Sequence, residues 1–280
     1  MSTAAGVLGL IAGGGAFPLD VARSARRQGW DVVAIAFHDH TDPALDETAA
    51  VSWFHPGEVG AALTVLRGAG VRDAVMAGKL PKTTLHARAD VARLDDTARA
   101  LLASTDARSD AALLNLVADF LGRSGIRLLP QTALVPELLA VEGLLGRRRP
   151  TPAESADIAF GSRVAKAIAS LGIGQTVVVK DGCVLAVEAI DGTDATIERA
   201  GRIAAGGCVV KLAWPGQDPR FDLPAIGPET VRIAIAAGAA VLAFEAGRTV
   251  VLDRAAVVAA ADAHDIALLG VAILEAEASS

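Results

Sequence analysis

The stretch VLGLIAGGGAFPLDVARSARRQGWDVVAIAF, residues 7–37, decides the fold of the first half of the chain. It begins with a continuous apolar run at 7–12 and ends at 31–37 with Asp31 and six apolar residues, and residues 18–28 between them have the pattern of an amphipathic helix. Apolar runs without alternation are typical of strands that are buried on both faces of a parallel sheet. The stretch therefore predicts a strand, a covering helix and a second, parallel strand.

The same alternation continues through the first half. The pattern predicts helices at 58–70, 94–102 and 110–121, and strands at 73–78 and 126–130. Such an order indicates an α/β domain with a Rossmann-like parallel sheet. We assign this domain to residues 1–145, and we expect a linker at 143–155, where Gly, Pro and three Arg residues gather.

The second half, residues 146–280, predicts a mixed α+β domain. Strands at 176–180 and 183–190 flank Asp181-Gly182, which is a strong hairpin signal. A second hairpin is expected from 241–245 and 249–252 across Gly247-Arg248. Helices are expected at 192–203, at 229–237 and after a cap at Asp253, and further strands at 207–214 and 266–271.

The composition excludes several classes of protein. Among 280 residues 52% are apolar, yet the uninterrupted apolar stretches are about a dozen residues long, whereas a membrane span needs roughly 20. The net charge of −6 and an aromatic content of 4% argue against nucleic-acid binding. The N-terminus lacks the basic region of a signal peptide, and two isolated cysteines fit a reducing compartment, so we expect a cytoplasmic protein.

The run Gly13-Gly14-Gly15, between a strand and a helix, is a candidate phosphate site. A helix N-terminus offers free N–H groups there, and glycines permit close approach. The alternative is a tight turn, because the pattern is not a complete G-x-G-x-x-G. Lys79 follows the predicted strand at 73–78, so it would lie at the same ligand-facing edge of the sheet, although an ordinary solvated loop is an equal alternative.

Acidic residues gather in two segments of the second half. The segment 187–201 contains Glu188 and Asp194, and the segment 216–228 contains Asp218 and Asp222. Hard carboxylate oxygens suit Mg²⁺ or Mn²⁺, and Lys180 and Lys211 in neighbouring elements could neutralise a diphosphate. For Asp194, capping of a helix is an equal alternative to binding metal. The rigid Asp-Leu-Pro context would hold the Asp222 side chain in a defined position, which favours a functional role for this residue.

Five segments in order resemble one family. They are GLIAGGGAFPLDVA at 9–22, AGK at 77–79, SDAALL at 109–114, VLAVEAIDGTDA at 184–195 and QDPRFDLPAIGPETV at 217–231. The chain resembles the LpxI-type UDP-2,3-diacylglucosamine pyrophosphatases of lipid A biosynthesis, from residue 8 to residue 271.

The resemblance implies magnesium-dependent hydrolysis of UDP-2,3-diacylglucosamine to UMP and 2,3-diacylglucosamine 1-phosphate, which is lipid X. It implies that Asp222 is catalytic and binds metal, with Glu188, Asp194 and Asp218 as further candidate ligands. Mn²⁺ is the alternative metal. Substrate contacts are expected from Gly13, Gly14, Gly15, Lys79, Asp110, Lys180, Thr193, Lys211 and Gln217. We also expect transient contact with the cytoplasmic face of the inner membrane, through a local patch such as 147–149, and leave a homodimer open.

Two other functions remain alternatives. A non-catalytic nucleotide- or lipid-binding module would not need the carboxylates. A Rossmann-type oxidoreductase would need a complete glycine motif and a Tyr or Cys acid/base, whereas this chain has an incomplete glycine motif and no Tyr.

Overall fold

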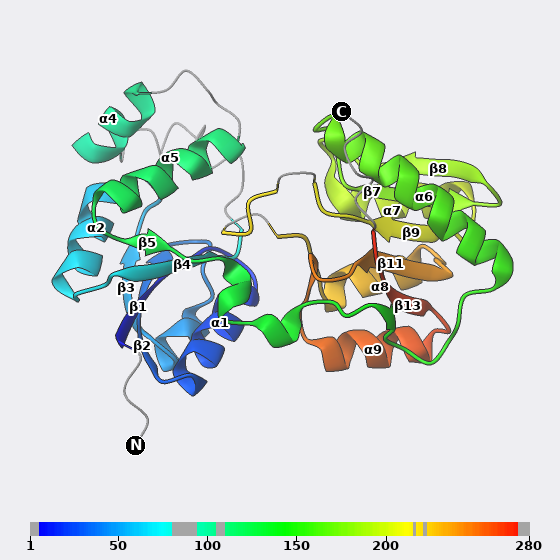
Figure 1. Cartoon of the computed structure of the whole chain (residues 1–280), viewed down its shortest axis with the longest axis horizontal. Coiled ribbons are helices and arrows are strands. Elements are labelled where there is room, and N and C mark those ends of the chain that lie inside the picture. The colour runs from blue at the N-terminus through cyan, green and yellow to red at the C-terminus, as the bar shows by residue number, and fades with distance from the viewer. Residues whose placement is uncertain (1–5, 80–93, 105–109, 215–216, 221–222, 274–280) are drawn as a thin grey trace. The chain divides into compact units, whose positions relative to one another are not determined.

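The computed structural model describes residues 6–79, 94–104, 110–214, 217–220 and 223–273, with the backbone alone for 110–112. The chain divides into two compact units (Figure 1). The first comprises Met1–Pro136 and Pro219–Phe221, and the second comprises Glu137–Asp218 and Asp222–Ser280. The chain therefore leaves the second unit once and returns to it.

The first unit is built on a five-stranded parallel sheet in the order β3-β2-β1-β4-β5. Its strands are β1 (Gly6–Ala12), β2 (Trp30–Phe37), β3 (Ala50–Phe54), β4 (Asp73–Ala77) and β5 (Arg127–Leu128). Its helices are α1 (Phe17–Arg27), α2 (Val59–Gly68), α4 (Asp96–Ala103) and α5 (Asp110–Arg123), with 3₁₀ turns η1 (Pro43–Glu47) and η2 (Gln131–Ala133).

The helices of the first unit cover the sheet on two sides. Leu66 of α2 and Leu121 of α5 pack against Ile35 and Phe37 on one face, and α1 packs against β1 and β2 on the other. The strand order reverses between β1 and β4, which is where open parallel sheets place ligands. The predicted Rossmann-like parallel sheet is confirmed.

The second unit has a six-stranded mixed sheet in the order β6-β13-β11-β9-β7-β8. Its strands are β6 (Gly143–Leu144), β7 (Thr176–Lys180), β8 (Cys183–Val187), β9 (Cys208–Lys211), β11 (Val241–Glu245) and β13 (Ala267–Val271). β9, β11 and β13 are parallel, whereas β6, β7 and β8 each run antiparallel to a neighbour. β10 (Ala225–Ile226) and β12 (Val250–Val251) form a separate pair.

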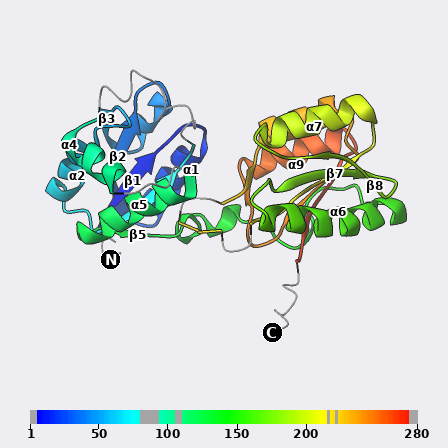
Figure 2. The same cartoon turned by 90° about the horizontal axis from the view of Figure 1, so that it is seen from above.

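Helices cover both faces of this sheet, as Figure 2 shows for α6 on one side and α7 and α9 on the other. The helices are α6 (Pro152–Ser170), α7 (Gly192–Ile203), α8 (Pro228–Ala236) and α9 (Arg254–Ala263), and a 3₁₀ turn, η3 (Pro136–Leu138), precedes them. Val177 and Val179 of β7 face α6, while Val178 between them faces the core under α7, α8 and α9. The mixed sheet with helices confirms the predicted class.

The predicted hairpin at 241–252 is wrong. β11 lies between β9 and β13 and is parallel to both, and β12 pairs with β10 instead. All five residues of β11 are buried, as a central parallel strand requires. The hairpin of β7 and β8 is confirmed, with Asp181 at a φ of 50° in the turn.

The linker expected at 143–155 is also wrong. β6 within this range pairs with β13, and α6 begins at Pro152 behind the N-cap Thr151. The predictions did not include β3 or α6. The division into domains at 145 and 146 stays a prediction, while the two compact units divide after Pro136.

Candidate functional site

The carboxyl edge of the six-stranded sheet gathers buried polar side chains. β9 ends at Lys211 and β11 ends at Glu245, and in the register Lys211 lies opposite both Phe244 and Thr176. Thr176 is fully buried, and Lys211 and Glu245 are 5% and 7% exposed. Buried charged groups need partners, so an edge with this composition is a candidate site.

Glu188, directly after β8, is fixed at this edge by two hydrogen bonds. Its Oε1 accepts from the Thr193 hydroxyl at 3.1 Å, and its Oε2 accepts from the Gln175 backbone N–H at 3.1 Å. The Thr193 hydroxyl also lies 3.2 Å from that of Thr176. A Cβ on Gly174 would come within 2.2 Å of the Glu188 carbonyl oxygen, so only glycine permits this close approach. The structure thus brings the predicted residues Glu188 and Thr193 together.

Lys211 lies at the same edge, and its Nζ donates to the Ala225 carbonyl oxygen at 3.0 Å. Ala225 opens β10 and comes three residues after Asp222 in the sequence. A buried ammonium bound to a backbone carbonyl holds that backbone in place. The observed contact of Lys211 therefore anchors the chain just beyond the Asp-Leu-Pro motif.

Glu245 belongs to this edge, but the sequence analysis did not single it out. Its Oε2 accepts from the Ala213 N–H at 2.8 Å, and its Oε1 lies 3.6 Å from Nη1 of Arg248. The available signal was a charged residue at the end of an otherwise apolar strand. Because the strand was predicted to belong to a hairpin, its last residue, Glu245, was not expected at a ligand-facing edge of the sheet.

Two amide side chains at this edge have unused polar atoms. Within the described part of the chain, Oε1 of Gln175 and Nε2 of Gln217 are buried without a hydrogen-bond partner. The Gln217 Oε1 accepts from the Trp214 N–H at 2.9 Å. Buried polar atoms without partners are rare in proteins and cost about 1–3 kcal/mol each, so these two atoms are candidate contacts for a bound group.

Other predicted residues do not join this cluster. Lys180 ends β7, whereas Thr176 begins it, so the two lie roughly 13 Å apart along the strand. The Lys180 Nζ donates to the Ala205 carbonyl oxygen at 2.7 Å. Asp194 is exposed in the first turn of α7, where a carboxylate is favoured by the helix dipole.

The glycine run of the first unit lies where the fold places ligands, but much of its backbone is occupied. The Gly13 and Gly14 N–H groups donate to the Ala77 and Lys79 carbonyl oxygens, each at 2.8 Å, and the Lys79 N–H donates back to Gly14 at 3.0 Å. A Cβ on Gly13 would lie 2.8 Å from the Lys79 oxygen. Gly15, with a φ of 91°, has open space around it. These contacts support the tight-turn alternative for Gly13 and Gly14.

Some candidates lie outside what the structure describes. Asp222 falls outside the described residues, as does the side chain of Asp110, whose backbone begins α5. Asp218 is described and half-buried. Among the residues that are described, no three His, Cys, Asp or Glu side chains form a group able to hold a metal ion. The predicted set of metal ligands, which includes Asp222, therefore stays a prediction.

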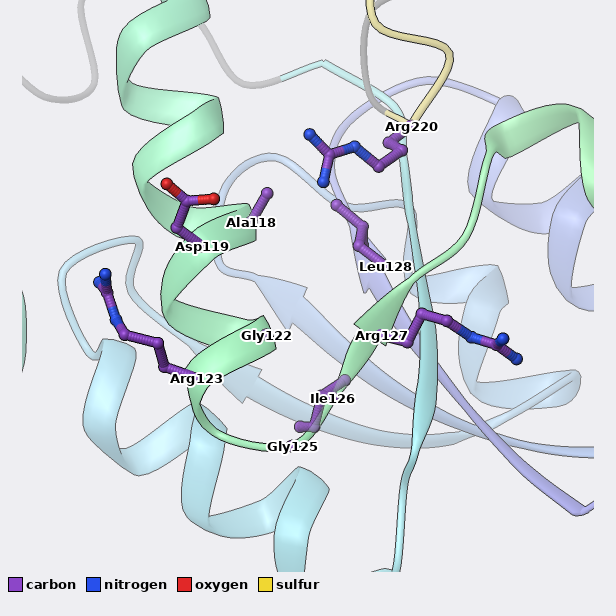
Figure 3. A pocket seen from close by; sticks show the side chains of 9 residues that line it. All are labelled: Ala118, Asp119, Gly122, Arg123, Gly125, Ile126, Arg127, Leu128 and Arg220. Carbon is purple, nitrogen blue, oxygen red and sulfur yellow. The ribbon is translucent and has the colours of Figure 1, made fainter.

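A hollow of about 610 Å³ lies between α5 and β5 in the first unit, and three arginines are among the residues that line it. Their side chains do not converge on one point (Figure 3). Arg220 extends over the hollow near Leu128, while Arg123 and Arg127 point away from it. Arg127 is instead bound to Asp73 at 2.7 Å. Because its cations do not converge, we assign no ligand to this hollow.

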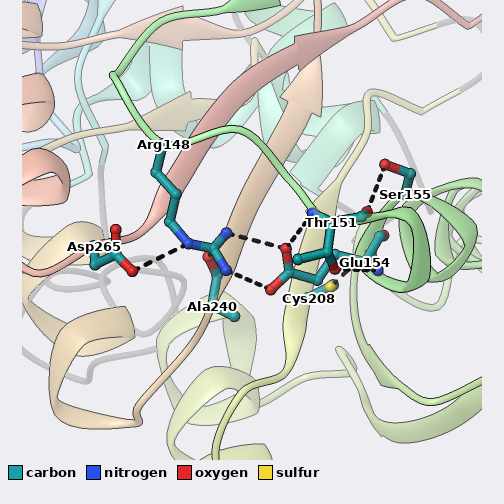
Figure 4. A network of polar contacts seen from close by, with 7 residues as sticks. All are labelled: Arg148, Thr151, Glu154, Ser155, Cys208, Ala240 and Asp265. Atoms are coloured by element: carbon teal, nitrogen blue, oxygen red, sulfur yellow. Dashed lines mark hydrogen bonds and ion pairs between the residues drawn. The ribbon is translucent and has the colours of Figure 1, made fainter.

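In the basic patch expected at 147–149, the side chain of Arg148 is bound to residues of the protein itself (Figure 4). Arg148 donates two hydrogen bonds to Glu154, at 2.6 and 3.0 Å, so its charge is neutralised within the protein. Arg147 is exposed and lies 3.4 Å from Asp262. No helix in the described ranges is both long and apolar enough to cross a membrane.

Fold and site together define a two-unit α/β protein. Both candidate sites lie at the carboxyl ends of parallel strands, and the one in the second unit is rich in carboxylates and amides. Comparison with known proteins then identifies the family of the chain. The model of the LpxI N-terminal domain matches residues 7–138, and that of the LpxI C-terminal domain matches residues 141–269.

The chain also matches a curated relative over nearly its whole length. This protein of Caulobacter vibrioides is named UDP-2,3-diacylglucosamine pyrophosphatase LpxI. It is 35% identical over 273 residues, which cover 94% of this chain and 97% of the relative. The chain belongs to the LpxI family.

Proposed function

We propose that this chain hydrolyses the diphosphate of UDP-2,3-diacylglucosamine to UMP and 2,3-diacylglucosamine 1-phosphate, a step of lipid A biosynthesis. The observation that carries the proposal is the match of both LpxI domains together with 35% identity to the named pyrophosphatase. The buried polar edge of the second unit supports it, because cleavage of a phosphoanhydride needs fixed charge and a placed water molecule.

Two described side chains at this edge, together with Asp222, have a part in the proposal. Glu188, held by Thr193 and Gln175, supplies a rigid carboxylate, and Lys211 anchors the backbone just after Asp222. Asp222 orients the attacking water or binds metal. Preorganised groups of this kind lower the barrier because they need no rearrangement as charge develops.

A magnesium ion, or manganese as the alternative, is part of this proposal. Glu188 and Asp222 would hold it together with the Gln175 side-chain oxygen, which is buried and has no partner in the described residues. Hard oxygen donors match the preference of Mg²⁺. When bound, the ion would polarise the phosphoryl group and lower the pKa of a bound water.

The deciding experiment is release of UMP from UDP-2,3-diacylglucosamine by wild type, Asp222→Asn and Asp96→Asn. Asp96 is a fully exposed carboxylate on α4 and serves as the matched control. We expect turnover by wild type and the control, and a loss of about 100-fold or more in Asp222→Asn, as is typical when a group that stabilises the transition state is removed. Normal turnover by Asp222→Asn would refute the role of Asp222.

The same assay separates the alternatives. Chelation of divalent metal should abolish turnover, and magnesium should restore it. Binding of UMP by wild type without any hydrolysis, with either metal, would favour the non-catalytic binding module. The oxidoreductase alternative receives no support from the glycine run, since two of its N–H groups are already bonded within the protein.

We also propose that the protein works in the cytoplasm, in transient contact with the inner membrane, because the substrate of the named relative is diacylated. Cosedimentation with vesicles of anionic and zwitterionic phospholipid tests this contact. Retention in the supernatant under every condition would count against it. The homodimer is tested by light scattering during gel filtration.

A further inference from the structure

Thr176 is tied to Glu188 at both the backbone and the side chain of the glutamate. The Thr176 carbonyl oxygen accepts from the Glu188 backbone N–H at 2.9 Å. The Thr176 hydroxyl lies 3.2 Å from that of Thr193, which donates to Oε1 of Glu188 at 3.1 Å. Thr176 begins β7, Thr193 lies in the first turn of α7, and Glu188 directly follows β8. Side chains from a strand, a helix and a loop therefore form one chain of contacts that ends on the carboxylate.

The donors and acceptors fix the direction of this chain of contacts. An ionised carboxylate only accepts hydrogen bonds, so the single hydroxyl proton of Thr193 is used on Glu188. The Thr193 oxygen then accepts from Thr176, whose hydroxyl is the donor. Thr176 is fully buried, and a hydroxyl buried to this extent needs a partner, which Thr193 supplies.

These contacts use only part of the acceptor capacity of Glu188. Its Oε1 accepts from Thr193, and its Oε2 accepts from the Gln175 backbone N–H at 3.1 Å. A carboxylate has roughly four lone-pair sites, so about half of them remain for a ligand. Because Glu188 is only 8% exposed, these partners rather than solvent set the orientation of its carboxylate.

We propose that Thr176 is a positioning residue for the hydrolysis: through Thr193 it orients the Glu188 carboxylate, and being fully buried it does not itself touch substrate. The inference rests on the proposed function, in which Glu188 supplies a rigid carboxylate, and extends it to a hydroxyl in the interior of the second unit. Hydrogen-bond partners that orient a metal-binding carboxylate are typically worth about 10- to 100-fold in metal affinity or activity.

The first test compares Thr176→Val with Thr176→Ser and with the matched control Thr196→Val. Valine keeps the shape of threonine but removes the hydroxyl, whereas serine keeps the hydroxyl. Thr196 of α7 is buried to the same extent, and its hydroxyl donates to the Gly192 carbonyl oxygen at 2.9 Å instead of toward Glu188.

We expect kcat to fall by about 10- to 100-fold in Thr176→Val and to stay within about 3-fold of wild type in Thr176→Ser and in the control. KM should stay within about 2-fold throughout, because the substrate contacts are unchanged. An unchanged kcat in Thr176→Val, or an equal loss in Thr176→Ser, would overturn the proposal.

A double variant tests whether Thr176 acts through Thr193. In the Thr193→Val protein the link to Glu188 is already broken, so the addition of Thr176→Val should lower kcat by less than about 2-fold. A further loss as large as the one in the wild-type background would show that Thr176 acts by another route, and would refute the proposal.

Urea unfolding tests the contact between the two hydroxyls without substrate or metal. Thr176→Val removes a hydrogen bond from wild type but not from the Thr193→Val protein, where the Thr176 hydroxyl has already lost its partner. The change in urea midpoint caused by Thr176→Val should therefore be more destabilising in the wild-type background than in the Thr193→Val background. Equal changes in the two backgrounds would exclude the proposal. If wild type failed to hydrolyse the substrate, the proposed function would fail, and this comparison would still decide whether Thr176 holds Thr193.

Discussion

At the scale of the residue, two glycines of this chain differ in the space around the position that a Cβ would occupy. A Cβ on Gly13 would meet the Lys79 carbonyl oxygen at 2.8 Å and the Gly78 carbon at 2.9 Å, both of them backbone atoms that cannot turn aside. Gly122, in α5, has nothing within 4 Å of the Cβ position. The first glycine is required by packing, and the second leaves the helix more flexible than alanine would.

We therefore predict opposite effects of the same substitution. Gly13→Ala should lower the free energy of unfolding by about 1–3 kcal/mol, because β1 and the end of β4 must separate. Gly122→Ala should raise it by about 0.5–1 kcal/mol through the higher helix propensity of alanine. Urea unfolding at pH 7 measures both, and equal effects of the two substitutions would contradict the packing argument.

Single residues also show how far sequence reasoning reached. Asp181 was assigned to a hairpin turn and Asp253 to a helix cap, and both assignments are confirmed. These features depend on neighbours in sequence, so local patterns reveal them. Glu245 was missed because its meaning depends on Ala213, which is 32 positions away in the chain.

At the scale of the element, the N-terminus of α6 is held by a network of charges (Figure 4). Thr151 and Glu154 form a capping box, and Glu154 also binds Arg148. Burial alone would raise the pKa of Glu154, but hydrogen bonds from Arg148 and the Thr151 N–H outweigh it and hold this pKa below its ordinary value. Burial raises the pKa of the neighbouring Cys208 to about 12, so that thiol stays protonated.

The lowered pKa of Glu154 predicts a pH-dependent contribution to stability. The contribution is complete above the unfolded-state value of about 4.3 and is lost as the pH falls through the lower folded-state value. Glu154→Gln should thus lower the free energy of unfolding by about 1–3 kcal/mol at pH 7 and by progressively less below about pH 4. Urea titrations at several pH values measure this, with Glu142→Gln, which replaces an exposed carboxylate, as control. A difference that stayed constant down to pH 3 would contradict it.

The helices and strands that have a clear hydrophobic period could be predicted from the sequence. Which strands pair with one another was harder to predict. α1, β1, β2 and the β7–β8 hairpin appear where the pattern placed them. The pairing of β11 was not readable, since an apolar strand of five residues suits a hairpin or a central parallel position equally well. Its neighbours β9 and β13 decide the pairing, and they are distant in sequence.

At the scale of the whole molecule, the first unit is not continuous in sequence. It ends at Pro136 but also includes Pro219–Phe221. The connection is specific, because the backbone N–H of the buried Gln131 donates to the Pro219 carbonyl oxygen at 2.9 Å. The Gln131 side chain in turn donates to Met76 at the end of the parallel sheet.

This connection predicts that the first unit is weaker alone. A fragment of residues 1–136 lacks Pro219 and leaves a buried N–H without its partner, at a cost of about 1–3 kcal/mol. Its thermal midpoint should therefore lie several degrees below that of the same unit in the intact chain. The Trp214→Phe variant of the intact chain is the comparison, since its fluorescence then comes from Trp30 and Trp53 in the first unit. Identical midpoints would contradict the stabilising role of Pro219–Phe221.

By itself, the sequence determined the succession of elements, the parallel sheet of the first unit and, through five motifs in order, the family. Local interactions and hydrophobic period encode these features, and they need no knowledge of the partner strands. Only the tertiary structure decided that Glu245 meets Ala213, that Lys211 binds Ala225, and that Lys180 lies away from this edge. Such contacts join residues that are remote in sequence, and they exist only because burial of the apolar strands sets the order and register of the sheet.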